Sequence, residues 1–301
     1  MILPQTYTAA LLLMVLAVLC QGSWAHTLKL AGRSWRFELY YFDFAVGLMA
    51  AALVCGFTLG SMGFDGFALM DDFLRAGKRQ WLFGFLAGLV FNLANMLLAG
   101  AISVAGVAVA FPLAAGITLL GSAIWMGLNA PVNPFLLIAA CLLILVAVAV
   151  DAAAYYLRTA GQAKKGSRPR YLKPLILCGS SGVLGALVYP MMDWARAGEA
   201  GLGPYGAAIV FSGGILASTV VFDLFFMNLP VAGEPLEILD YFHGGLKVHG
   251  FGLLGGIVWC AGLVAAFVVA GAPLEVQPRA SALLAISQGG LVVAALWGLL
   301  A

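Results

Sequence analysis

Apolar stretches of about 20 residues follow one another along the chain, separated by short polar segments. A helix of about 20 apolar residues crosses the roughly 30 Å hydrocarbon core of a bilayer. Such runs are helical, because the strands of a membrane barrel are shorter and alternate apolar with polar positions. The pattern predicts an all-α polytopic membrane helical bundle with nine transmembrane helices, at residues 7–30, 37–60, 81–99, 101–128, 135–157, 172–194, 205–229, 247–270 and 280–300.

Composition supports an integral membrane protein. Of the 301 residues, 63% are hydrophobic and 9% are charged, whereas about a quarter of the residues of a soluble domain are charged. The net charge of +2 is small and dispersed, so we expect no nucleic-acid partner. The five cysteines lie in apolar runs and form no Cys-x-x-Cys pair. We therefore expect no disulfide framework, metal site or cofactor.

The N-terminal apolar run resembles a secretory signal, because Ser23-Trp24-Ala25 has the form of a cleavage site. No positive charge precedes Tyr7, however, and the run is long enough to span a membrane, so we treat it as the first helix. Lys and Arg are concentrated in the linker 158–173 and on the same side of the bundle. The positive-inside rule then predicts a cytoplasmic linker and an outside N-terminus. We expect the membrane to be the bacterial inner (cell) membrane.

The two halves of the chain carry matching motifs in the same order. Gly84-x-x-x-Gly88 in the third predicted helix corresponds to Gly252-x-x-x-Gly256 in the eighth, and Ser122-Ala123-Ile124-Trp125 to Ala294-Ala295-Leu296-Trp297. A first unit of five helices would leave the second unit inverted, as in many secondary transporters. This predicts a first repeat at 1–157, a basic cytoplasmic linker at 158–173 and a second repeat of four helices at 174–301.

Motifs near both ends of the chain resemble one transporter family. They are Leu19-Cys20-Gln21-Gly22-Ser23-Trp24, Tyr41-Phe42-Asp43-Phe44, Phe57-Thr58-Leu59-Gly60 and Ala285-Ile286-Ser287-Gln288. This combination is similar to the ureide permease family of the drug/metabolite transporter superfamily. The resemblance implies ten helices in two inverted repeats and the transport of small polar solutes such as ureides or nucleobases. On that pattern, a tenth helix is missing beyond Leu300.

Ionisable residues inside the predicted helices are candidates for function, because intramembrane charge is costly. Asp43 lies well inside the second helix, and we expect it to couple transport to protons. His26 titrates near neutral pH and could pair with Asp43, or it could simply bond a backbone carbonyl. For four further residues near helix ends we favour a side chain that reaches the interface; these are Asp151, Asp223, Lys247 and His249.

Five residues are candidates for binding the solute. Asn92 and Asn95 are three apart on one helix and project from nearly one face. Their carboxamides can donate and accept hydrogen bonds to a ureide or nucleobase, although amides also join membrane helices. Trp24 could stack on a flat solute, Trp259 could line the pocket or serve packing, and Gln288 completes the set.

The sequence therefore predicts a secondary active transporter, a permease for a ureide, nucleobase or sugar, with the proton as co-substrate. A passive facilitator or an exporter of metabolites or drugs is the nearer alternative. A membrane sensor or enzyme is the more distant one, because the sequence has no phosphate-binding loop, His-Glu-x-x-His or Gly-x-Ser-x-Gly motif. The sequence does not indicate the oligomeric state.

Overall fold

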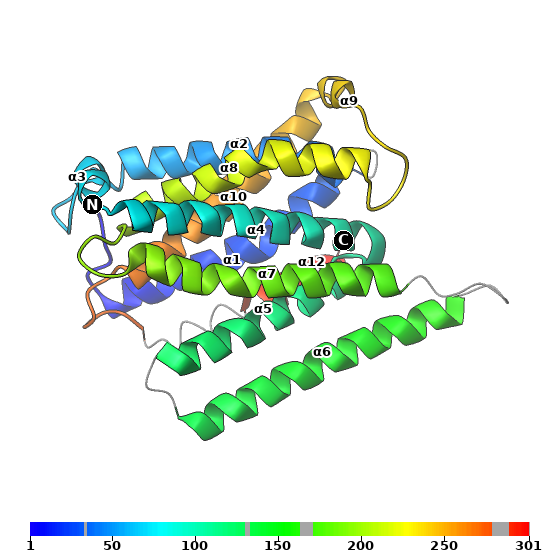
Figure 1. The fold of residues 1–301 in the computed structure, drawn as a ribbon, viewed down its shortest axis with the longest axis horizontal. Helices are drawn as coiled ribbons and strands as arrows, with labels where there is room; N and C mark the ends of the chain where they lie inside the picture. Colours follow the sequence, from blue (N-terminus) through cyan, green and yellow to red (C-terminus); the bar gives the residue numbers. More distant parts are fainter. Residues whose placement is uncertain (33–34, 130–132, 163–170, 279–288, 301) are drawn as a thin grey trace.

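The computed structural model describes residues 1–32, 35–129, 133–162, 171–278 and 289–300. These residues form helices joined by short connections, and within them no strand is present (Figure 1). Eight helices in this part of the chain are long and apolar enough to cross a membrane. They are α1 (Tyr7–Ala31), α2 (Phe37–Phe57), α4 (Lys78–Ala105), α5 (Val107–Asn129), α6 (Pro134–Gln162), α7 (Leu172–Arg196), α8 (Pro204–Asn228) and α10 (Leu246–Ala270).

Three shorter helices complete the described chain: α3 (Leu69–Arg75), α9 (Ile238–Phe242) and α12 (Gly289–Leu300). Each of the eight long helices corresponds to one predicted span, although α4 also extends into the start of the next. The expected break near Gly100 is wrong, because α4 continues to Ala105 and the chain turns at Gly106. Gly106 has a φ of 86°, a conformation that glycine adopts without steric cost. The ninth predicted span is described over α12 alone.

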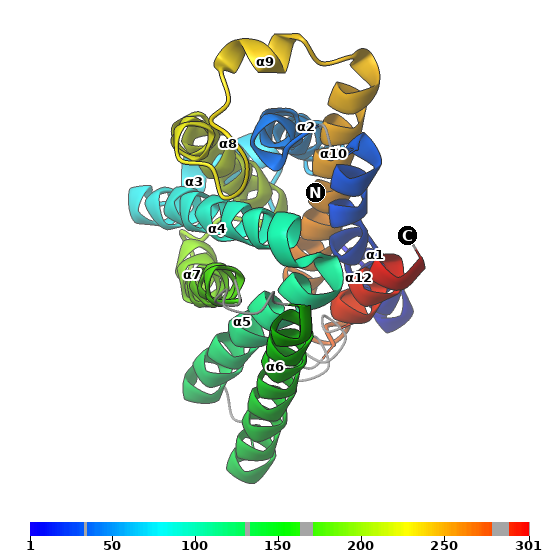
Figure 2. The same cartoon turned by 90° about the vertical axis from the view of Figure 1, so that its right-hand side faces the viewer.

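The long helices pack in two corresponding sets. Helix α4 lies along α7 and α8, and α10 lies along α1 and α2, while α2 packs against α8 between the sets (Figures 1 and 2). Glycines allow the closest approaches. A Cβ at Gly88 of α4 would overlap the carbonyl oxygen of Phe211, and one at Gly256 of α10 would overlap that of Phe44. Small residues commonly serve this purpose between membrane helices.

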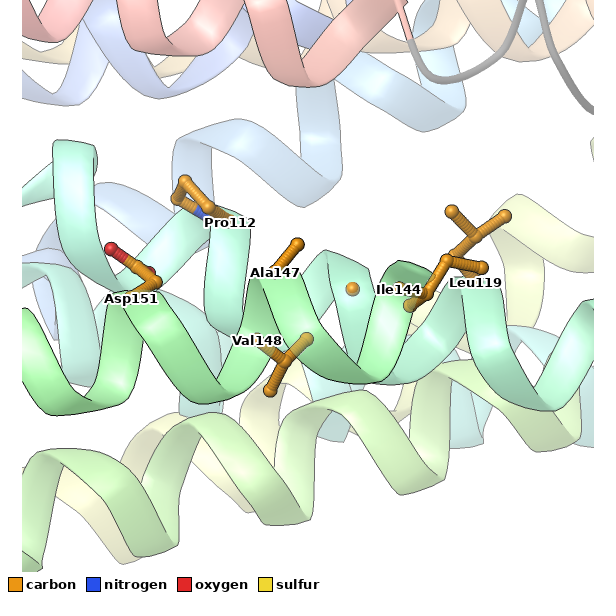
Figure 3. Close-up of a pocket in the computed structure, with 7 residues that line it drawn as sticks. Pro112, Leu119, Ile144, Ala147, Val148 and Asp151 are labelled. Atoms are coloured by element: carbon orange, nitrogen blue, oxygen red, sulfur yellow. The ribbon is translucent and has the colours of Figure 1, made fainter. Parts of the chain in front are cut away.

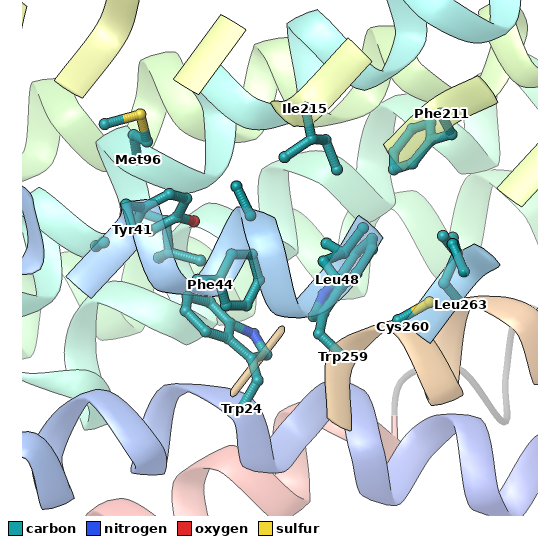
Figure 4. Packing of buried hydrophobic residues seen from close by; sticks show 14 of the residues in the cluster. Trp24, Tyr41, Phe44, Leu48, Met96, Phe211, Ile215, Trp259, Cys260 and Leu263 are labelled. Carbon is teal, nitrogen blue, oxygen red and sulfur yellow. The ribbon is translucent and has the colours of Figure 1, made fainter. Parts of the chain in front are cut away.

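Helices α2, α8 and α10 are the most buried of the long helices. Their aromatic side chains form the centre of the bundle, where Tyr41, Phe44 and Phe211 are almost completely buried (Figure 4). Helix α6, in contrast, packs along α5 and lies apart from the rest of the bundle (Figures 1 and 2). Its large apolar side chains, including Leu143 and Leu157, are exposed, as expected for a helix that faces lipid.

Neighbouring long helices alternate in direction along the chain, which defines two sides of the bundle. We call the side at which α1, α4 and α8 begin the N-terminal side, and the side at which α2, α7 and α10 begin the opposite side. The short helix α3 lies on the N-terminal side and α9 on the opposite side (Figure 1).

Candidate functional site

A cavity of about 670 Å³ lies inside the bundle, between α1, α4, α5, α7, α8 and α10. Its deep part is lined by aromatic rings from three of these helices. Trp259 stacks on Phe211, with ring centroids 6.1 Å apart, and lies 4.5 Å from the ring of Phe91. Trp24 borders the same space from α1 and packs against Phe44 at 5.4 Å (Figure 4). The cavity can therefore hold a small solute against flat apolar surfaces.

The mouth of the cavity lies on the N-terminal side, where α5 and α7 end. The indole nitrogen of Trp125 donates a 2.5 Å hydrogen bond to the Asp193 carboxylate. The guanidinium of Arg196 lies over the ring of Phe267, 5.5 Å from its centroid. Asp193 and Asn129 are exposed, although both line the cavity. The cavity thus opens to solvent on this side, past one acidic and one basic group.

The opposite side of the cavity is closed by packed side chains. Trp24 is 2% exposed, and Tyr40, Tyr41 and Phe44 lie beyond it with no measurable exposure. Tyr40 shares a 2.6 Å hydrogen bond with Thr27 of α1, which joins α2 to α1 at this level. The cavity is therefore accessible from the N-terminal side, and among the described residues packed side chains close it on the opposite side.

The two candidate asparagines occupy different environments. Asn92 is fully buried and donates hydrogen bonds to the Ile215 carbonyl, to Ser218 at 2.9 Å and to Thr219 at 3.1 Å. It therefore joins α4 to α8 and does not line the cavity. Asn95 does line the cavity, and its amide nitrogen has no hydrogen-bond partner among the described residues. Of the two, Asn95 is the one placed to contact a solute.

Asp43 lies outside the cavity, between α2, α9 and α10. It is 4% exposed and accepts hydrogen bonds from the Tyr241 hydroxyl at 2.6 Å and from His249 Nδ1, 2.8 Å away. Burial, followed by the hydrogen bond and charge of Asp43, raises the pKa of Tyr241 well above its usual value, so the phenol remains protonated and donates. Trp35 packs edge-on against His249 at 5.0 Å and covers the group.

The pair with Asp43, one of the two alternatives for His26, is not formed. His26 instead stacks on Trp297 of α12, with centroids 4.4 Å apart. The reason is that α10, rather than α1, lies along the face of α2 that carries Asp43. His249 therefore takes the place that was expected for His26, and it is not the free interfacial side chain that its position near a helix end suggested.

Asp223 also departs from expectation, because it does not reach the interface. It is fully buried in α8, and neither carboxylate oxygen has a hydrogen-bond partner in the described structure. Asp151 borders a separate cavity of about 140 Å³ between α5 and α6 (Figure 3). Asp193 and Arg196 carry no direct signal in the sequence, since charges at the end of a helix are usually solvated.

Three of the candidate binding residues, Trp24, Asn95 and Trp259, thus come together around one cavity. Gln288 lies outside the described residues. Within the described ranges, no group of three or more His, Cys, Asp or Glu side chains could hold a metal ion.

Comparison with protein-family models, with curated proteins and with solved structures found no match to this chain.

Proposed function

We propose that this protein is a secondary transporter of the drug/metabolite superfamily, similar to the ureide permeases, that moves a small polar solute by alternating access. The observation that carries the proposal is the cavity of about 670 Å³, which is open to the N-terminal side and sealed on the opposite side. Its volume lies within the range of about 300–1,000 Å³ that is typical of small-molecule sites. A cavity accessible from one side only is what one state of an alternating-access carrier requires.

The packing of the helices supports two inverted repeats. Helices α4 and α10, which carry the matching glycine motifs, contact the first two long helices of the other half: α4 contacts α7 and α8, and α10 contacts α1 and α2. Helix α5 packs on α7 as α12 packs on α1. A two-fold relation between units at 1–157 and 174–301, joined by the linker 158–173, accounts for these pairs. Such units can rock against each other around a central solute.

The lining of the cavity favours a flat, polar solute. Trp24, Phe91 and Trp259 offer ring faces for stacking, while Asn95 offers an amide that can both donate and accept. Thr118 and Ser181 add hydroxyl groups on the α5 and α7 walls. A nucleobase or ureide suits this combination well, and a sugar can use the same rings and hydroxyls.

Proton coupling is the energy source that we propose, because buried carboxylates such as Asp43 lie on the sealed side of the cavity. Intramembrane acids of this kind commonly serve in proton relays. A passive facilitator is the nearer alternative, and it would use the same cavity without any change in protonation. The two differ in whether a pH gradient drives accumulation of the solute.

The proposal can be tested by ligand-induced stabilisation of the purified protein. Ureides, nucleobases, sugars, amino acids and lipophilic cations would each be added, and the midpoint of thermal unfolding measured. A ligand at about 100 times its dissociation constant stabilises the folded state by about 2.7 kcal/mol. We expect one class of flat polar solutes to raise the midpoint of the wild type but not of Trp259→Ala.

A matched control is Gly250→Ala, since Gly250 lies in α10 with open space around the position of a new Cβ. It should respond to the solute as the wild type does. Uptake into proteoliposomes then separates the mechanisms: accumulation driven by a pH gradient supports a coupled carrier, and equilibration without accumulation supports a facilitator. A well-folded wild type that responds to none of the classes contradicts the proposal.

A further inference from the structure

A second group of buried polar side chains lies between α2, α4 and α8, on the sealed side of the cavity. Asp223 of α8 is fully buried, and so is the hydroxyl-bearing ring of Tyr41. Neither the Asp223 carboxylate nor the Tyr41 hydroxyl has a hydrogen-bond partner within the described chain. A buried carboxylate that is charged and unpaired is very costly. A bound proton neutralises Asp223 without requiring a partner among the described side chains.

The basic group that precedes α2, Arg36, is already paired. Arg36 makes two hydrogen bonds to Glu38, at 2.5 and 3.3 Å, and a third to the Glu234 carbonyl at 2.5 Å. Glu38 is fully buried and follows Phe37, whose ring lies 6.0 Å from that of Phe226 of α8, so a second carboxylate lies within about one helical turn of Asp223. Two carboxylates in one buried site, of which only one is paired with a guanidinium, favour a state with one proton bound. Because Glu38 holds the arginine, the proton belongs on Asp223.

The other charged groups around α8 do not alter this assignment. The ammonium group of Lys173, on α7, donates a hydrogen bond to the Val231 carbonyl. Asp72 and Arg75 pair with each other at the far end of α8, where Asp72 accepts from the Gly203 backbone. From α10, His249 bonds Asp43.

Helix α4 faces Asp223 with amides that do not titrate. The two are Asn92 and Asn95. The phenol of Tyr41 is the remaining titratable neighbour.

Tyr41 connects Asp223 to the cavity. Phe37 of α2 meets Phe226 of α8 with ring centroids 6.0 Å apart, and the two helices run in opposite directions, so Tyr41, one turn further along α2, lies level with Asp223, one turn back along α8. Asn92 bonds Ser218 and Thr219 of α8, so Asn95, about one turn further along α4, lies at the same level and also lines the cavity. Figure 4 shows the Tyr41 ring near Phe44 and Met96 in the buried centre of the bundle. Three polar groups thus lead from the solute space to a buried acid. Their unused hydrogen-bonding capacity allows them to change partners when the charge of Asp223 changes.

We infer that Asp223 is the proton-binding carboxyl group of the transport cycle and that Tyr41 and Asn95 link its protonation to occupancy of the cavity. The inference rests on the proposed function and assigns its coupling site to Asp223 instead of Asp43, because the Asp43 carboxylate is already hydrogen-bonded to Tyr241 and His249. In the state seen here, Asp223 is protonated and Tyr41 is free. When the proton leaves to water, the Asp223 carboxylate accepts a hydrogen bond from the Tyr41 hydroxyl. The hydroxyl then turns away from Asn95, and the contact between Asn95 and a solute changes.

The proton is released in another conformation. Asp223 lies near the end of α8, where residues 229–236 fold back: Leu236 donates to the Met227 carbonyl and Glu234 accepts from Arg36. This segment and the Arg36–Glu38 pair cover the acid from the opposite side. Solvent therefore reaches Asp223 only after they separate. Opening of that side is the same step that would expose the cavity there.

Infrared difference spectroscopy tests the protonation state without any solute. We expect the wild type to show the carbonyl band of a buried carboxylic acid, and Asp223→Asn to lose it. The Asn side chain imitates a neutral carboxyl group, so this variant should fold. Asp43→Asn is the matched control and should retain the band. A band that persists in Asp223→Asn overturns the inference, and so does a wild type that shows no band but is stabilised by Na⁺ in an Asp223-dependent way.

Solute binding then tests the coupling. We expect the affinity of the wild type to change by up to about tenfold per pH unit while one linked proton titrates. Asp223→Asn should bind with an affinity independent of pH, exchange solute across proteoliposomes, and fail to accumulate it in a pH gradient. Retained pH dependence in Asp223→Asn contradicts the inference and leaves the transporter proposal intact. Failure of the wild type to bind any solute contradicts the proposed function instead, and leaves the infrared result to stand alone.

Discussion

Asn92 and Asn95 show how two identical side chains, less than one helical turn apart, can have different roles. The Asn92 amide donates its hydrogen bonds to α8. Asn95 faces the cavity, and its amide nitrogen has no hydrogen-bond partner among the described residues. Asn95→Ala should weaken solute binding about tenfold, the effect of one lost hydrogen bond of about 1.4 kcal/mol. Calorimetric titration of the purified protein measures this change.

The reciprocal variant is Asn92→Ala, which removes bonds between α4 and α8. Interhelical hydrogen bonds in membrane proteins contribute about 0.6 kcal/mol each on average, so the variant should unfold at a lower temperature while retaining most of its affinity. If Asn92→Ala weakened binding as much as Asn95→Ala did, the two residues would have to act on the solute together, contrary to their separate environments.

His249 stabilises the protein by satisfying Asp43. Removing it in His249→Ala leaves one oxygen of a buried carboxylate without its 2.8 Å partner, so we expect a loss of about 1–3 kcal/mol. The same loss should shrink in the Asp43→Asn background, because the charge that needs a partner is gone. His243→Ala is the control, since His243 is exposed. Equal losses in both backgrounds, measured by reversible denaturant unfolding, would show that the two side chains are not coupled.

Helix contacts depend on glycine at two equivalent places. Gly88→Ala would push α4 away from the Phe211 carbonyl, and Gly256→Ala would push α10 away from that of Phe44. Each should cost about 1–3 kcal/mol, as overpacking does. Gly213→Ala and Gly250→Ala are matched controls within α8 and α10, because a new Cβ there meets open space, and they should be neutral or slightly stabilising. Thermal unfolding in one detergent compares all four.

Equal effects at all four glycines would instead indicate a general response of helices to alanine. Cooperative losses at Gly88 and Gly256 in the double variant would support the two-fold relation between α4 and α10.

The elements were predictable because each long apolar run is a complete unit in a membrane: the backbone must bond within the segment, and length fixes where it ends. The turn at Gly106 was not predictable, since the residues on both sides of it are equally apolar. Partners across helices were harder still. His26 and His249 are similar choices for Asp43 in the sequence, and only the packing of α10 along α2 distinguishes them. Asp223 lies near a helix end, so its sequence position indicated an acid at the interface. Its burial follows only from the helices that pack over α8.

Some residues of the cavity were predictable, because they can be recognised from the sequence of a single helix. Trp24, Asn95 and Trp259 are rare side chains in apolar runs, so each was a visible exception. Asp193 and Arg196 lie at the end of a helix, where charge is ordinary, and their place at the mouth follows only from how α7 meets α5 and α10. Gathering side chains from six helices is a property of the whole bundle, which no single segment specifies.

The bundle as a whole makes a prediction about access. The cavity reaches solvent on the N-terminal side, so a cysteine at Ser181, which is buried but lines the cavity, should react with a small membrane-impermeant thiol reagent added from that side. A cysteine at Ser212, equally buried in α8 but away from the cavity, should not react. Both variants would be made in a background without the five native cysteines, and labelling followed by mass spectrometry.

Alternating access adds a second requirement, because the cavity must at some time face the other way. Reagent added from the opposite side should label the Ser181→Cys protein slowly in the absence of solute and faster when the transported solute drives turnover. A channel would instead permit labelling from both sides at once, and a sensor with a fixed pocket would permit it from the N-terminal side alone. Since Trp24, Tyr41 and Phe44 form the seal in the present state, Phe44→Ala should allow leak labelling from the opposite side without solute, and so identify the layer that has to open.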